Sequence, residues 1–302
     1  MNQILSAIDV GSNAIRMMIA AHRNGRIVEI KKFRSPVRLG RDVFENGSIT
    51  EQTFKEVAET FLQFAHLNRK YKVHYGRSVA TSAAREAKNG QQLVKYILEK
   101  SHIKVEIIDG MEEAKLIFKA VQKEIDLEGR HALLIDIGGG SVEVSLAQNA
   151  KMKVTQSFPM GTVRILDQLK KRKLHEKSLK VLIGDFMPPL SHFIEKNISG
   201  LPMDFAVGTG GNLECMARLK LDLLHKTPNN YLTLNELVAI VEQLMKINIQ
   251  TRIDKLGLRP DRADVIVPAI LVVKTIMRQS SIDKIHIPCV GLRDGLLWSL
   301  IS

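Results

Sequence analysis

The stretch LIDIGGGSVE at residues 134–143 decides the fold, because the stretch AIDVGSNA at residues 7–14 repeats its design. In both, a short apolar strand ends at an aspartate, small residues follow, and a second apolar run begins. Glycines let backbone N–H groups approach an anion closely, so this composition is typical of a strand–turn–strand phosphate loop. Two copies in one chain predict duplicated α/β domains with a phosphate-filled cleft between them.

The candidate phosphate-binding residues belong to these two turns and to a third glycine-rich turn, GTGGN at residues 208–212. They are Gly11, Ser12, Asn13, Gly138, Gly139, Gly140, Ser141, Gly208, Gly210 and Gly211.

Strands and helices alternate along the whole chain, which indicates an α/β layout with mixed sheets. We expect hairpins at 4–20 and 132–147, and further strands at 27–34, 77–81, 104–108, 152–158, 205–207 and 285–290. Thr50 is the expected N-cap of one helix, and another is expected to begin at Glu112. The polar residues 128–131 predict a domain boundary, giving domains 1–128 and 129–291 with a final helix, 292–302, packed on the first.

Composition narrows the class of protein. The chain has 302 residues, two cysteines and a net charge of +12, and no apolar run long enough to span a membrane. With no signal peptide in view, we expect a cytoplasmic protein. The basic run Lys170–Lys173, with His175 and Lys177 behind it, is either a solvated helix end or an anion-binding rim. No aromatic residues interleave with these charges, which weakens a nucleic-acid interpretation.

Three charged residues are candidates for chemistry. Glu112 and Glu113 lie in the first turn of a predicted helix, where the helix dipole favours their ionised forms. Either they simply decorate the helix start, or one is a base aimed at a water molecule. Arg85 follows a strand end, and its guanidinium is suited to gripping phosphoryl oxygens.

Taken together, these motifs resemble those of the Ppx/GppA phosphatase family, which comprises exopolyphosphatases and guanosine pentaphosphate phosphohydrolases. The resemblance covers essentially the whole chain. It rests on Asp9-Val-Gly-Ser-Asn13 with Arg16, Thr81 and Arg85, Gly110-Met-Glu-Glu-Ala114, Asp136-Ile-Gly-Gly-Gly-Ser-Val-Glu143, Gly161-Thr-Val-Arg164, Gly208-Thr-Gly-Gly211, Arg262-Ala-Asp264 and Gly291-Leu-Arg-Asp-Gly295. It implies two actin-like, ribonuclease H-like domains of the actin, sugar kinase and chaperone ATPase superfamily, with the active site in the interdomain cleft. The length resembles that of the short, two-domain members.

The resemblance also implies roles for individual residues. Glu113 matches the family's general base, Arg85 the arginine that grips the terminal phosphates, and Asp136 an acid that helps to hold Mg²⁺ and the attacking water. Asp9 and Glu143 match acidic positions close to the metal. The implied catalytic residues are therefore Glu113, Asp136 and Arg85, the implied metal ligands are Asp9, Asp136 and Glu143, and the implied cofactor is Mg²⁺.

Three positions depart from the usual family pattern, namely Ala14, Asp109 and Val142. Two of them remove a hydroxyl near a phosphate loop, and one adds a negative charge near the base. They bear on substrate preference and turnover rather than on the class of reaction.

The leading expectation is a Mg²⁺-dependent hydrolase that releases terminal orthophosphate from inorganic polyphosphate, with guanosine pentaphosphate (pppGpp) as a second substrate. The alternative from another class is a sensor that binds guanosine penta- or tetraphosphate with little turnover. A kinase with ATP on the third turn ranks below these, and nucleic-acid binding rests on charge alone. We expect no membrane or specific nucleic-acid partner, and a homodimer stays open.

Overall fold

The computed structural model describes residues 3–301. The chain divides into two compact units, of which the first holds residues 1–120 and 291–302 and the second residues 121–290. The domain boundary at residue 128 stays a prediction. No helix in the described part of the chain is both long and apolar enough to cross a bilayer.

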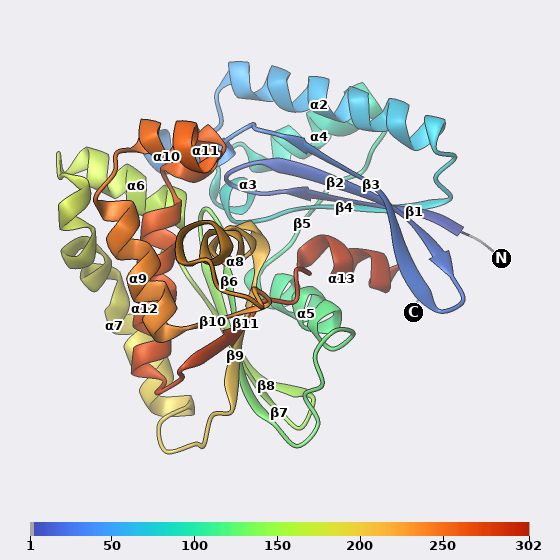
Figure 1. Ribbon diagram of the computed structural model, residues 1–302. Helices are drawn as coiled ribbons and strands as arrows, with labels where there is room; N and C mark the ends of the chain where they lie inside the picture. The colour runs from blue at the N-terminus through green and yellow to red at the C-terminus, as the bar shows by residue number, and fades with distance from the viewer. Residues whose placement is uncertain (1–2, 302) are drawn as a thin grey trace. The chain divides into compact units, whose positions relative to one another are not determined.

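The first unit is built on a five-stranded mixed sheet with strand order β3-β2-β1-β4-β5. Figure 1 shows α2 and α4 on one face of this sheet and α13 on the other. Its elements are β1 (Gln3–Val10), β2 (Ile15–Arg23), β3 (Arg26–Ser35), α1 (Leu39–Asn46), α2 (Glu51–Lys70), β4 (Tyr75–Ala80), α3 (Ser82–Glu86), α4 (Gly90–Ser101), β5 (Glu106–Ile107), α5 (Gly110–Val121) and α13 (Leu292–Ser299).

The second unit repeats this plan on a six-stranded sheet with strand order β10-β11-β9-β6-β7-β8. Its elements are β6 (His131–Ile137), β7 (Val142–Gln148), β8 (Lys151–Phe158), α6 (Thr162–Lys171), the 3-10 turn η1 (Glu176–Ser178), α7 (Leu179–Asn197), β9 (Phe205–Thr209), α8 (Gly210–Leu224), β10 (Tyr231–Thr233), α9 (Leu234–Met245), α10 (Ile249–Leu256), α11 (Pro260–Ala263), α12 (Ile266–Gln279) and β11 (Lys284–His286).

The repeat is visible in strand register as well as in strand order. In each unit a hairpin and a third antiparallel strand precede a helix, β1-β2-β3-α1 in one and β6-β7-β8-α6 in the other. Asp9 faces Arg16 across the first hairpin, and Asp136 faces Glu143 across the second. The two predicted phosphate turns are therefore equivalent corners of two similar sheets.

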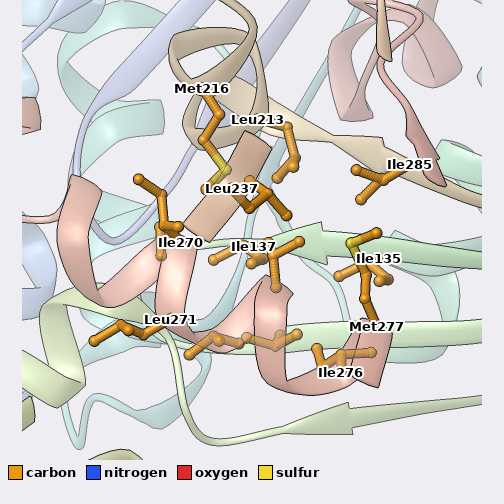
Figure 2. Packing of buried hydrophobic residues seen from close by; sticks show 14 of the residues in the cluster. Ile135, Ile137, Leu213, Met216, Leu237, Ile270, Leu271, Ile276, Met277 and Ile285 are labelled. Atoms are coloured by element: carbon orange, nitrogen blue, oxygen red, sulfur yellow. The ribbon is translucent and has the colours of Figure 1, made fainter. Parts of the chain in front are cut away.

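A continuous apolar core holds the second sheet against its helices. Ile135 and Ile137 of β6 are buried among Leu213 and Met216 of α8 and Ile270 of α12 (Figure 2). Because Asp136 is the second-last residue of β6, burial of the apolar residues of β6 fixes the strand that carries the candidate site.

Helix α2 begins as its sequence predicts. Thr50 is its N-cap and accepts a hydrogen bond from the Thr53 backbone at 3.3 Å. The same threonines bind Asp42 of α1, whose Oδ2 accepts from Thr50 Oγ1 at 2.7 Å and from Thr53 Oγ1 at 2.6 Å.

Several boundaries differ from the sequence expectations. β5 covers only 106–107, β11 ends at His286, and α5 begins at Gly110 rather than at Glu112. Helix α1 and strand β10 were not anticipated, because both are short and contact tertiary neighbours rather than following a long apolar period.

Candidate active site

The second phosphate turn is held by the start of helix α6. The Gly138 carbonyl accepts from the Thr162 backbone at 3.1 Å, and the Gly139 carbonyl accepts from the Val163 backbone at 2.8 Å. The Gly140 carbonyl accepts from the Gly161 backbone at 3.1 Å and from Arg164 Nε at 2.9 Å. All three glycine carbonyls are therefore bound on the α6 side of the turn.

The amide groups of the same turn are left available. Among the described residues, neither the Gly139 nor the Gly140 N–H donates a hydrogen bond to another protein group. Only Gly138 of the glycine run donates, to the Ser141 carbonyl at 3.0 Å. Successive amides without protein acceptors are the donors that an anion requires.

The first phosphate turn has the same construction. Gly11 donates to the Ala14 carbonyl at 3.2 Å, as Gly138 does to Ser141. The Ser12 carbonyl accepts a hydrogen bond of 2.8 Å from the Gly40 backbone at the start of α1. Helix α1 therefore holds the first turn in the way that α6 holds the second. Ala14 takes part through its backbone and its methyl group is buried, so the missing hydroxyl does not alter this turn's framework.

The second turn is flanked by two carboxylates. A carboxylate oxygen of Asp136 and one of Glu143 lie within 4.8 Å of each other. Ser157 Oγ donates to Glu143 Oε1 at 2.7 Å, and Thr209 Oγ1 donates to Asp136 Oδ1. Oriented carboxylates with hydroxyl partners form a hard oxygen donor set that fits Mg²⁺.

Asp9 has a different environment although it occupies the equivalent position. Arg16 Nη1 lies 3.4 Å from Asp9 Oδ2, in the place that Glu143 takes beside Asp136. Burial raises the pKa of Asp9, while the charges of Arg16 and Arg293 act in the opposite direction. Asp9, one of the three implied metal ligands, thus already faces the positive charge of Arg16.

The third glycine-rich turn supports the second one. Gly210 adopts a φ of +83°, and a Cβ there would lie 3.1 Å from Asp136 Oδ1. Asn212 Nδ2 donates to the Ile137 carbonyl at 3.0 Å, and Arg262 binds Asn212 Oδ1. Gly208 packs against Leu213 and Ile285, so its lack of a side chain serves the core.

Arg85 and Glu113 lie together in the first unit. Arg85, in the last turn of α3, donates to the Ile108 carbonyl at 2.7 Å and lies 3.9 Å from Glu113 Oε2. Glu113 is in the first turn of α5 and only 7% exposed. The candidate base and the candidate phosphate-gripping arginine are therefore neighbours at one helix start.

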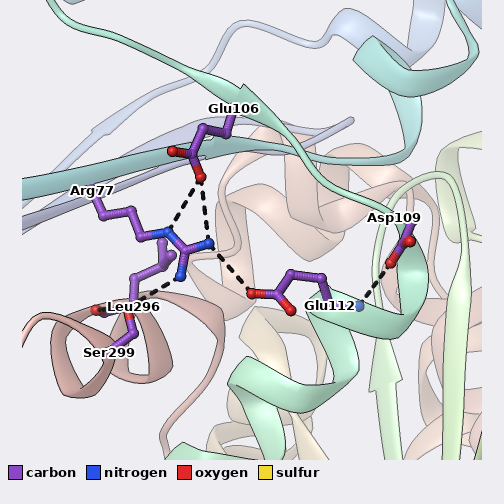
Figure 3. A network of polar contacts seen from close by, with 6 residues as sticks. All are labelled: Arg77, Glu106, Asp109, Glu112, Leu296 and Ser299. Carbon is purple, nitrogen blue, oxygen red and sulfur yellow. Dashed lines mark hydrogen bonds and ion pairs between the residues drawn. The ribbon is translucent and has the colours of Figure 1, made fainter. Parts of the chain in front are cut away.

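Glu112 has other partners and is held away from this pair. Arg77 Nη2 lies 3.3 Å from Glu112 Oε1 and 3.4 Å from Glu106 Oε2, and Arg77 Nη1 donates to Ser299 Oγ (Figure 3). Asp109, the unusual residue before Gly110, accepts from the Glu112 backbone at 2.8 Å and so caps α5. The two adjacent glutamates thus have separate roles in the local structure.

Sequence reasoning named no role for several residues that shape the site. Arg164 and Gly161 fall in a motif that was recognised without a function. Thr209 lies between two glycines of the third turn, and Asn212 directly follows the last of them. Ser157 carried no signal, because only the β7–β8 register places it beside Glu143.

Two curated relatives align with nearly the whole length of this chain. Guanosine-5'-triphosphate,3'-diphosphate pyrophosphatase of Aliivibrio fischeri is 26% identical over 307 residues, which cover 100% of this chain and 60% of that protein. Exopolyphosphatase 1 of Mycobacterium bovis is 26% identical over 97% of this chain and 87% of its own length. The chain thus spans less than two thirds of the first relative and most of the second.

The fold has solved counterparts. The crystal structure of an exopolyphosphatase from Cytophaga hutchinsonii superimposes with a TM-score of 0.88 at 26% identity and covers 99% of this chain and 98% of that one. The expected actin-like fold of two α/β domains is confirmed. The profile of the Ppx/GppA phosphatase family matches residues 18–302, and the chain therefore belongs to that family.

Proposed function

We propose that this protein hydrolyses the terminal phosphoanhydride bond of inorganic polyphosphate and releases orthophosphate, with pppGpp as a second substrate. The observation that carries the proposal is the second phosphate turn, whose carbonyls are all held by α6 while the Gly139 and Gly140 amides stay available beside two carboxylates. The relatives named exopolyphosphatase 1 and guanosine-5'-triphosphate,3'-diphosphate pyrophosphatase support the same substrate class.

In the proposed reaction, water attacks the terminal phosphorus while the bridging P–O bond breaks. Glu113 takes the proton of the water, Arg85 and the turn amides bind the phosphoryl oxygens, and the shortened polyphosphate leaves. Phosphoryl transfer leaves little covalent work to the protein, so positioning and charge stabilisation provide most of the rate.

Asp136 and Glu143 are the residues that would hold the metal, with Thr209 and Ser157 orienting them. Mg²⁺ bound there would neutralise charge on the phosphoryl oxygens. Asp9 is a weaker ligand in this proposal, because Arg16 already balances its charge.

A phosphate-release screen tests the function. Polyphosphate, pppGpp, ATP and GTP should be compared with Mg²⁺ and with EDTA. We expect release from polyphosphate that EDTA abolishes. Tight binding of pppGpp by titration calorimetry, with no release from any substrate, would instead establish the alternative, a sensor of guanosine penta- and tetraphosphate. A cytoplasmic location and a homodimer stay predictions.

A further inference from the structure

Helix α6 connects the second phosphate turn to a strongly basic part of the same unit. Its first turn holds the glycine carbonyls, and its ten residues extend about 15 Å from there. Residues 170–180, the basic segment, follow at its end and contain six lysines and arginines but only one acid. One helix therefore joins the candidate catalytic turn to a concentration of positive charge.

The acids near this segment are already bound. Asp167 lies 2.9 Å from Lys171, and Asp185 lies 2.5 Å from Arg172. Glu176, the acid inside the segment, accepts hydrogen bonds from both Nη atoms of the buried Arg252, at 2.7 Å on Oε1 and 2.9 Å on Oε2. These three carboxylates are thus paired with specific cations and do not neutralise the remaining lysines of the basic segment.

Exposed cations remain after this pairing. Within the part of the chain that the structure describes, Lys173, Lys177 and Lys180 are exposed and have no carboxylate within 4.0 Å. Burial and the nearby charges of Arg278 and Lys180 also lower the pKa of Lys274, as expected where cations crowd together. A helix C-terminus alone favours one or two cations, so it does not account for a run of this length.

We propose that the basic segment binds the trailing phosphates of a long inorganic polyphosphate whose end occupies the second phosphate turn. The inference rests on the proposed function and deepens it, by predicting a preference for long chains. A separation of about 15 Å along α6 requires several linked phosphates, so tripolyphosphate would not reach the segment. The absence of aromatic side chains in residues 164–185 favours polyphosphate over single-stranded nucleic acid.

The test compares long-chain polyphosphate with tripolyphosphate in the double variant Lys173→Glu/Lys177→Glu. We expect KM for the long chain to rise about tenfold, with kcat and the KM for tripolyphosphate within about twofold of wild type. Added salt should raise the long-chain KM more steeply in the wild type than in the variant, because fewer counterions are released by the variant. The double variant Lys196→Glu/Lys226→Glu changes net charge equally at other exposed positions of the unit and should leave both values unchanged.

Equal effects of Lys173→Glu/Lys177→Glu on both substrates would overturn the inference while leaving the proposed function intact. The inference would also be overturned if the wild type bound RNA or duplex DNA at physiological salt and this variant did not, since the segment would then bind nucleic acid. If the wild type released orthophosphate from neither substrate, the proposed function itself would fail.

Discussion

Gly161 controls the shape of the second phosphate turn although it lies outside it. A Cβ at this position would lie 2.4 Å from backbone atoms of Gly139 and Gly140, and backbone cannot move aside as a flexible side chain can. Gly161→Ala should therefore displace the turn, raise KM at least tenfold and cost about 1–3 kcal/mol of stability. Steady-state kinetics and chemical unfolding measure the two effects.

Gly184 provides the matched control for that substitution. It lies on the exposed side of α7, and a Cβ there would meet nothing within 4 Å. Gly184→Ala should raise stability by about 0.5–1 kcal/mol, because alanine loses less backbone entropy in a helix, and should leave KM unchanged. A normal KM in Gly161→Ala would show that α6 does not position the turn.

At the scale of the elements, Asp42 joins α1 to the start of α2. Burial alone would raise the pKa of Asp42, but hydrogen bonds from Thr53 and Thr50 outweigh it and hold the pKa below its ordinary value of 3.8. Because the pKa is lower in the folded than in the unfolded chain, the stabilisation is present above about pH 4 and is lost as the pH falls below that value.

Asp42→Asn should therefore lower the free energy of unfolding by about 1–3 kcal/mol at pH 7, and the deficit should shrink as the pH falls toward 3. Urea unfolding of the wild type and the variant between pH 3 and pH 7 measures this difference in the free energy of unfolding. The exposed change Glu99→Gln on α4 should cost less than about 0.5 kcal/mol throughout. A deficit independent of pH would mean that the Asp42 charge is not what holds α1 to α2.

Long elements were predictable because their apolar residues repeat with a regular period, as in the hairpins and α2. Short elements such as α1 and β10 were not, since tertiary contacts rather than local pattern define them. The two phosphate turns could be recognised in the sequence as small residues after an aspartate, with one glycine in the first turn and three in the second. The hydroxyls of Ser157 and Thr209 were not, because strand register alone brings them to Glu143 and Asp136.

At the scale of the whole molecule, one plan occurs twice with different charges. The second unit has an acidic pair, Asp136 and Glu143, where the first has an ion pair, Asp9 and Arg16. The backbone framework of both turns is kept while the side chains beside them diverge. We expect this divergence to direct the metal to the second unit and to leave the first turn as an anion binder.

Thermal unfolding tests this asymmetry. Mg²⁺ should raise Tm of the wild type by stabilising the folded state through binding. Asp136→Asn should abolish that increase, whereas Asp9→Asn should leave most of it. If Asp9→Asn removed the Mg²⁺ effect and Asp136→Asn did not, the assignment of the metal to the second unit would be wrong.

The adjacent glutamates offer the most direct test of the proposed hydrolysis, because they differ in role but hardly in position. Orthophosphate release from polyphosphate should be measured for the wild type, Glu113→Gln and Glu112→Gln, with circular dichroism to verify folding. Loss of a general base predicts a fall in kcat of about a hundredfold to ten-thousandfold for Glu113→Gln and less than about fivefold for Glu112→Gln. Wild-type release by a folded Glu113→Gln protein would contradict the account.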